Sequence, residues 1–116
     1  MLSFGGQRIF LCRQAVDMRK AFDSLSDYVR CELGMDPFQG YVLVFIGKDH
    51  TRAKVLVWES TGFWLCAKRL ETSRFQLPET VRGSGALPLS VAQVTVLLDE
   101  VLPAAAGASA VDAGSR

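Results

Sequence analysis

The sequence predicts an α+β fold: a mainly antiparallel sheet of four or five strands, with one helix after the first strand and another at the C-terminal end. Three apolar runs, residues 41–46, 53–58 and 63–68, follow one another across short polar or glycine-containing turns, as the strands of a β-meander do. Two further segments repeat apolar residues at helical spacing. Either an open sheet or a small barrel fits this pattern.

The first strand and the first helix are expected before the meander. Residues 8–12 are mostly apolar and follow Gly5 and Gly6, which favours a strand. Asp17 can cap the helix that follows, because its carboxylate can accept hydrogen bonds from the free N–H groups of the first turn. Gly34 is placed to end this helix. Its apolar face comprises Met18, Phe22, Leu25, Val29 and Leu33.

Two segments flank the meander. Pro37 and Gly40 predict a turn over residues 36–40. Residues 74–78 favour a short edge strand, because a proline is tolerated at a sheet edge and not in a central strand. Residues 79–89 are predicted to form a loop.

The second helix has a clear start and stop. Ser90 and Gln93 form the S-x-x-Q capping pattern, and Pro103 ends the helix. Its apolar positions are Val91, Val94, Leu97, Leu98 and Val101. We expect residues 1–102 to form one α+β domain and residues 103–116, rich in Ala, Gly and Ser, to be disordered.

The meander is apolar on both of its faces. Residues 41–46 and 55–58 are apolar at consecutive positions, so both sides of the sheet must leave water. Two arrangements satisfy this requirement. Either a helix covers each face, or one face is covered by a partner or by self-association as a homo-oligomer.

Composition narrows the class of protein. The formal net charge of the 116 residues is +1, and residues 1–88 hold twelve of the thirteen Lys and Arg with nine of the twelve Asp and Glu, so the body is mildly basic. The three cysteines, Cys12, Cys31 and Cys66, are too scattered for a disulfide framework or a zinc site. We expect no cofactor and no metal.

With neither a signal peptide nor a membrane span in the sequence, we expect a cytoplasmic protein.

The sequence does not favour an enzyme. DNA strand transfer requires carboxylates that hold two metal ions, but the candidate acids are better explained by caps, helix pairs and turns; they are Asp17, Asp23, Asp49 and Glu59. His50 lies in a polar segment with no nucleophile motif around it. Gly83 and Gly85 lack the lysine that a phosphate-binding loop requires.

Electrostatic binding is the more plausible chemistry. One loop carries Lys48, Arg52 and Lys54, and the end of the third meander strand and its following residues carry Lys68, Arg69 and Arg74. In a meander these two groups can lie at the same edge of the sheet and form one patch that contacts nucleic-acid phosphates. The alternative is a solvated surface of mixed charge, because acidic residues are interspersed. Trp58 and Trp64 could stack on bases, but the core is the favoured place for them.

Arg19 and Lys20 form a second candidate site. Both are expected in the first turn of the first helix, where their charges oppose the helix dipole and where an anionic partner such as phosphate would be favoured. The alternative is simple surface pairs, of Arg19 with Asp23 and of Lys20 with Asp23 or Ser24.

Several sequence blocks together resemble a known family. They are Asp-Met-Arg-Lys-Ala-Phe-Asp-Ser-Leu at 17–25, Asp-Pro-Phe-Gln-Gly at 36–40, Val-Phe at 44–45, Lys-Val-Leu-Val-Trp at 54–58 and Lys-Arg-Leu-Glu-Thr-Ser-Arg-Phe at 68–75. In this order the blocks resemble the accessory protein of insertion-sequence-66 elements, labelled TnpB of that element and unrelated to the RNA-guided nucleases of the same label. The resemblance covers roughly residues 8–100.

The resemblance implies a role in transposition beside a separate, larger transposase, which would be its partner. It implies no mechanism. We therefore expect a non-catalytic accessory protein that contacts element DNA, the transposase or both; the alternative is a protein-interaction adaptor that never touches DNA. The chain departs from the family pattern at Ala21 and Ser24, where the family usually has glycine, at residues 46–50, where arginine is commoner, and at Leu77, where the family has tryptophan. The departure at 46–50 weakens the basic loop.

Overall fold

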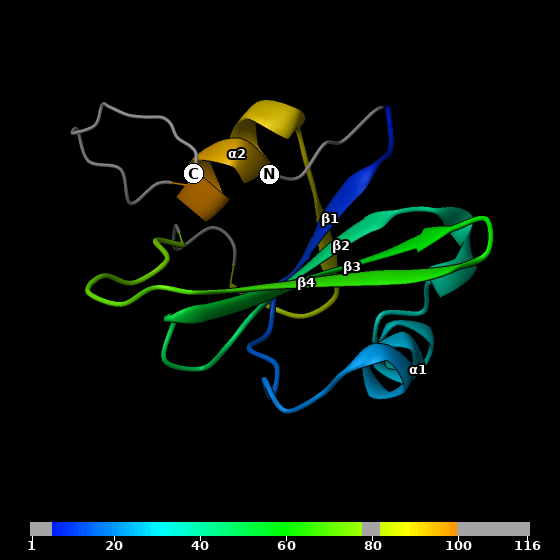
Figure 1. Cartoon of the computed structure of the whole chain (residues 1–116), viewed down its shortest axis with the longest axis horizontal. Coiled ribbons are helices and arrows are strands. Elements are labelled where there is room, and N and C mark those ends of the chain that lie inside the picture. The colour runs from blue at the N-terminus through cyan, green and yellow to red at the C-terminus, as the bar shows by residue number, and fades with distance from the viewer. Residues whose placement is uncertain (1–5, 78–81, 100–116) are drawn as a thin grey trace.

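A five-stranded, mainly antiparallel sheet forms the centre of the computed structural model, which describes residues 6–77 and 82–99 (Figure 1). The strands lie in the order β4-β3-β2-β1-β5, and β1 and β2 form the parallel pair. Their bounds are Ile9–Cys12 for β1, Val42–Ile46 for β2, Arg52–Glu59 for β3, Gly62–Arg69 for β4 and Ala86–Leu89 for β5. The predicted α+β fold and its meander, β2-β3-β4, are confirmed.

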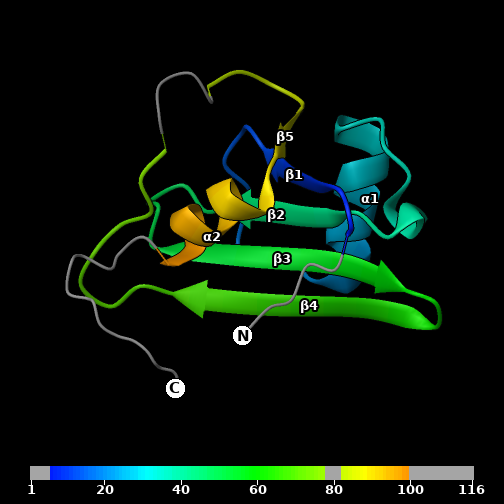
Figure 2. The ribbon, with the colours of Figure 1, turned by 90° about the horizontal axis from the view of Figure 1, so that it is seen from above.

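One helix covers each face of the sheet (Figures 1 and 2). Helix α1, Phe22–Glu32, buries Leu25 and Val29 against the face that carries Phe45. Helix α2, Val91–Asp99, buries residues such as Val94 on the opposite face, together with Phe75. Every residue of β2 is buried as a result. Of the two arrangements that the apolar meander allowed, the structure has a helix on each face.

The first helix begins later than predicted. Its N-cap is Ala21, whose N–H donates to Ser24 Oγ at 3.0 Å. Asp17 instead caps a turn, in which its carboxylate accepts from the Arg19 N–H at 2.9 Å. An aspartate side chain can cap either a turn or a helix. Because Asp17 caps the turn and Ala21 is the N-cap of α1, the prediction that Asp17 caps the helix was wrong. Met18 is buried, but from the turn and not from the helix.

The region after the meander also differs from the prediction. Residues 74–77 are not a strand, and residue 78 lies outside the described residues. Part of the predicted loop, residues 86–89, forms β5 and pairs with β1. Pro88 is compatible with this position because β5 is an edge strand.

The structure tests some of the remaining predictions, and others lie outside the described residues. The Ser90–Gln93 capping box is confirmed, with Gln93 N–H donating to Ser90 Oγ at 3.1 Å and Ser90 N–H to Gln93 Oε1 at 2.8 Å. The predicted helix position at Val101 and the tail at 103–116 lie outside the described residues. The turn at 36–40 contains the short 3-10 helix η1, Pro37–Gln39.

Candidate nucleic-acid interface

The two basic groups predicted from the sequence meet at one end of the sheet. In the β3–β4 register Arg52 lies opposite Arg69. Leu70 N–H donates to Thr51 O at 2.7 Å, and Phe75 N–H donates to His50 O at 2.7 Å. These bonds bring the β2–β3 turn, the end of β4 and the segment that carries Arg74 together. We call this region, residues 47–52 with residues 68–75, the basic end.

Arg52 and Arg69 form a cross-strand pair of like charge. Leu70 bonds to Thr51, so by the alternation of an antiparallel ladder the next pair, Arg52 and Arg69, is not hydrogen-bonded, and its Cα atoms are about 4.5 Å apart. Side chains directly opposite each other project from the same face, where like charges repel. Arg69 is partly compensated by an exposed ion pair with Glu71, at 3.1 Å.

A second segment, residues 16–20, adjoins this end. Val16 N–H donates to Ile46 O at 3.1 Å, and Lys54 Nζ donates to Lys20 O at 2.6 Å. Arg19 and Lys20 precede α1, which begins at Phe22. The prediction that they lie in its first turn was therefore wrong.

Arg19 pairs with Asp17 and not with Asp23. The Arg19 Nη2 to Asp17 Oδ2 distance is 2.7 Å, and the Arg19 side chain is 89% exposed. The guanidinium of Arg19 holds the pKa of the Asp17 carboxyl well below its usual range. Arg19 is thus presented at the surface but is partly neutralised by its neighbour.

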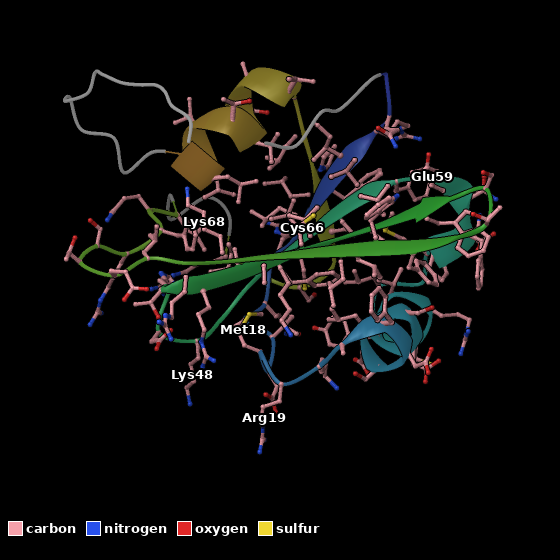
Figure 3. All side chains as sticks on the ribbon, viewed as in Figure 1. Met18, Arg19, Lys48, Glu59, Cys66 and Lys68 are labelled. Atoms are coloured by element: carbon pink, nitrogen blue, oxygen red, sulfur yellow. The ribbon has the colours of Figure 1, made fainter. Side chains whose placement is uncertain are left out.

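The predicted cations surround this end from both faces of the sheet. Figure 3 shows Lys48 and Arg19 on one side of the ribbon and Lys68 on the other, while Glu59 lies at the far end. Lys68 Nζ donates to Leu98 O in α2 at 2.7 Å, so this amine also holds the last turn of a helix. A cation near a helix C-terminus is favoured by the helix dipole.

A further cation, Arg13, lies at this end and was missed from the sequence. Arg13 follows β1 directly; its N–H donates to Gly85 O at 3.0 Å, and its Nη2 donates to Arg82 O at 2.9 Å. Because β1 and β2 are parallel, Arg13 ends its strand at the same end of the sheet as Lys48. Only knowledge of that parallel pairing would have pointed to Arg13.

The acids weighed as catalytic residues are dispersed. Asp49 accepts from Thr51 N–H at 3.1 Å, and this bond lowers the pKa of the Asp49 carboxyl. Asp23 lies in the first turn of α1, and Glu59 accepts from the Trp64 indole N–H at the far end of the sheet. Within residues 6–77 and 82–99, no three His, Cys, Asp or Glu side chains are grouped closely enough to hold a metal ion.

The far end of the sheet is aromatic. Phe38 from η1 packs on Trp58 and Phe63 with ring centroids 4.9 and 5.4 Å away, and the guanidinium of Arg8 lies over the rings of Phe10 and Tyr41. We call the cluster of Phe38, Trp58 and Phe63 the aromatic end.

The two tryptophans differ in their exposure. Trp58 is half-buried in the aromatic end, whereas Trp64 is 63% exposed on the opposite face. The prediction that both belong to the core was wrong for Trp64.

Comparison with known proteins finds two relatives and one family model. Two proteins of Sinorhizobium fredii, y4jC and y4hO, both named as uncharacterized, are 32% and 33% identical to this chain. The first match covers 80% of this chain and 78% of y4jC, and the second covers 81% and 80%. No solved structure matches. In the described part of the chain, no helix has the length and apolar character that crossing a bilayer demands. The IS66 Orf2-like protein family matches residues 7–106, and the chain belongs to that family.

Proposed function

We propose that this protein is a non-catalytic accessory protein of DNA transposition that contacts DNA through the basic end. Membership of the IS66 Orf2-like family supports the accessory role. The transposase of the same element is the protein partner that such a role requires. The contact with DNA rests on the geometry of the cations.

The observation that carries the proposal is the Arg52–Arg69 pair. The two guanidinium groups project from one face of an exposed hairpin, and the repulsion between them lowers the stability of the free protein. A phosphate between them would remove this cost and accept hydrogen bonds from both groups. Among the described residues Arg52 forms no ion pair, and its charge only adds to the hydrogen bonds from Thr51 that lower the pKa of Asp49.

The surrounding cations extend this contact. Lys48 lies in the β2–β3 turn, and Arg74 lies on the segment bonded to that turn. Contacts of this kind are made to the DNA backbone, carry no sequence preference of their own and weaken steeply with salt. The acids Asp49 and Glu71 limit the affinity, so we expect modest binding at physiological salt.

The test is DNA binding by matched charge variants. Fluorescence anisotropy with labelled duplex from the ends of the element would be measured over a salt series for wild type, Arg52→Gln and Arg30→Gln. Arg30 is an exposed α1 residue paired with Asp27, so its variant loses the same charge away from the basic end. Arg52→Gln should weaken binding about tenfold and reduce the salt slope by about one.

The same variant gives a second readout. Removing one of two facing like charges should leave the free energy of unfolding equal or slightly higher. Weaker DNA binding with unchanged stability supports the proposal. Equal binding by the Arg52→Gln and Arg30→Gln variants, or no binding by wild type even at low salt, would refute it.

The second candidate is an adaptor that binds only protein. It is favoured by the large apolar side chains at the surface, which include Phe38 at 49%, Trp64 at 63% and Val96 at 65% exposure. Copurification of the tagged transposase with wild type and with Trp64→Ser distinguishes the candidates. Loss of the transposase from Trp64→Ser, with no DNA binding by wild type, would favour the adaptor.

A further inference from the structure

The two edges of the sheet are protected to different degrees. Edge strand β5 has four residues and contains Pro88. The Arg13–Gly85 hydrogen bond fixes the alternation of the β1–β5 ladder and places the ring nitrogen of Pro88 on the outer side. That edge therefore lacks a donor where an incoming strand would need one.

Edge strand β4 carries no such protection. All of its residues from Gly62 to Arg69 pair in continuous register with β3, without a bulge or a proline, and residues 62–67 are uncharged. No described strand or helix lies beyond it (Figure 2). Long, regular edges of this kind accept another strand.

The outward-facing backbone groups of β4 can be assigned. Leu70 N–H bonds to Thr51 O, so Lys68, Cys66 and Trp64 direct their backbone groups to β3. The intervening residues direct theirs outward, and they are Phe63, Leu65, Ala67 and Arg69.

We propose that β4 pairs antiparallel with β4 of a second copy, about a twofold axis at Cys66, to form a dimer with a continuous ten-stranded sheet. The register sets Leu65 opposite Ala67 of the second copy and Phe63 opposite Arg69 of the second copy. All the outward groups of both strands are then matched. Moving the axis by one residue, to Leu65 or to Ala67, shifts the pairing by two and leaves Arg69 or Phe63, respectively, opposite a residue beyond the end of the partner strand.

The side chains of β4 are complementary to those of its own reversed copy. One half of the strand is aromatic, Phe63 and Trp64, and the other is basic, Lys68 and Arg69. Antiparallel pairing places the aliphatic stem of each Lys68 across the exposed Trp64 ring of the other copy, and each Arg69 beside a Phe63 ring. Glu59, bonded to the Trp64 indole N–H, adds a carboxylate on the side that receives the basic half. This self-complementarity favours a second copy over an unrelated strand, and it does not depend on DNA binding.

The register makes Cys66 a reporter of the contact. Its backbone groups point to β3, so the two Cys66 residues form a non-hydrogen-bonded pair with Cα atoms about 4.5 Å apart, within the disulfide range. Diamide, which takes up the two hydrogens released by two thiols, would be used as the oxidant. Cys31 is exposed and reports random collisions. The Cys31→Ser variant should form covalent dimers at least about tenfold faster than the Cys66→Ser variant, although Cys66 is the less exposed thiol.

Sedimentation equilibrium gives the independent test. Ala67→Pro removes an outward N–H but no bond to β3, and exposed Ala67→Lys brings two like charges together across the axis. Ala92→Lys, on the exposed surface of α2, is the matched control. Both Ala67 variants should raise the dimer dissociation constant at least about tenfold, with unchanged circular dichroism, and the control should not. A monomeric wild type at high micromolar concentration, a dimer that survives both Ala67 variants, or equal crosslinking through Cys31 and Cys66 would overturn the proposal.

Discussion

The basic end and the aromatic end of this sheet are held together in different ways. The basic end is joined by backbone hydrogen bonds between separate segments, Phe75 to His50 and Leu70 to Thr51, and the bond from Val16 to Ile46 attaches the adjoining segment. The aromatic end is held by contacts among the rings of Phe38, Trp58 and Phe63, which are partly open to water. Backbone bonds and a few buried anchors can therefore position a surface of charged side chains, whereas ring packing positions the aromatic end. Substitutions in pairs, one at each end, test this view.

The largest difference is expected for two phenylalanines. Phe75 is 1% exposed and anchors the segment that carries Arg74, whereas Phe38 is 49% exposed. Phe75→Ala should lower the free energy of unfolding by about 3–5 kcal/mol, and Phe38→Ala by about 1 kcal/mol. Urea denaturation of both variants measures the difference. Equal losses would mean that the aromatic end is as important to stability as the basic end.

A smaller contrast is expected for two glycines. A Cβ added at Gly47 would lie 2.7 Å from Met18 Cγ, whereas one added at Gly62, next to the aromatic end, meets nothing within 4 Å. Gly47→Ala should cost about 1–3 kcal/mol, and Gly62→Ala should be neutral or stabilise by up to about 1 kcal/mol.

The contact with Met18 can be isolated by a double-mutant cycle. In a Met18→Ala background the cost of Gly47→Ala should shrink, because the clash is gone. An unchanged cost in that background would contradict the packing of Met18 beneath Gly47.

The smallest contrast is a pH effect. The pKa of Asp17, which adjoins the basic end, is lowered by hydrogen bonds from Arg19, and the pKa of Asp36, which caps η1, is lowered by hydrogen bonds from Gln39 and the Phe38 N–H. A lowered folded pKa contributes stability above the unfolded value of about 3.8, and that contribution is lost as pH falls through the folded value. Asp17→Asn should flatten the acid side of the stability profile more than Asp36→Asn, as thermal unfolding between pH 2 and pH 5 would show. Superimposable profiles would argue against the Asp17–Arg19 pair in solution.

Local signals predicted the parts of the fold that depend on neighbouring residues. The Ser90–Gln93 cap and the three strands of the meander were predicted because their patterns lie within a few residues. Asp17 misled the prediction because a carboxylate can cap a turn or a helix with the same geometry. Strand β5 was missed because its pairing with β1 joins residues far apart in sequence, and Pro88 suggested a loop.

The candidate site also contains contacts that local sequence could predict and contacts that it could not. The meander predicted that the two basic groups could lie at the same edge of the sheet, and Arg52 and Arg69 do lie opposite each other there, since both belong to one hairpin. The sequence could not indicate that Lys20 adjoins Lys54 or that Arg13 lies at the same end of the sheet as Lys48, because these placements depend on the chain crossing over to form the parallel pair. The exposure of Trp64 likewise depends on how far along the sheet α2 extends.

Pro88 also limits how large an assembly can become. A sheet with two open edges can add copies without end and grow into a fibre, but here the missing donor on β5 stops growth on that side. A twofold contact at β4 uses the other edge in both copies at once, so the assembly closes at two. Replacing Pro88 with a residue that carries an N–H would reopen the second edge and would turn a closed pair into a candidate for polymerisation.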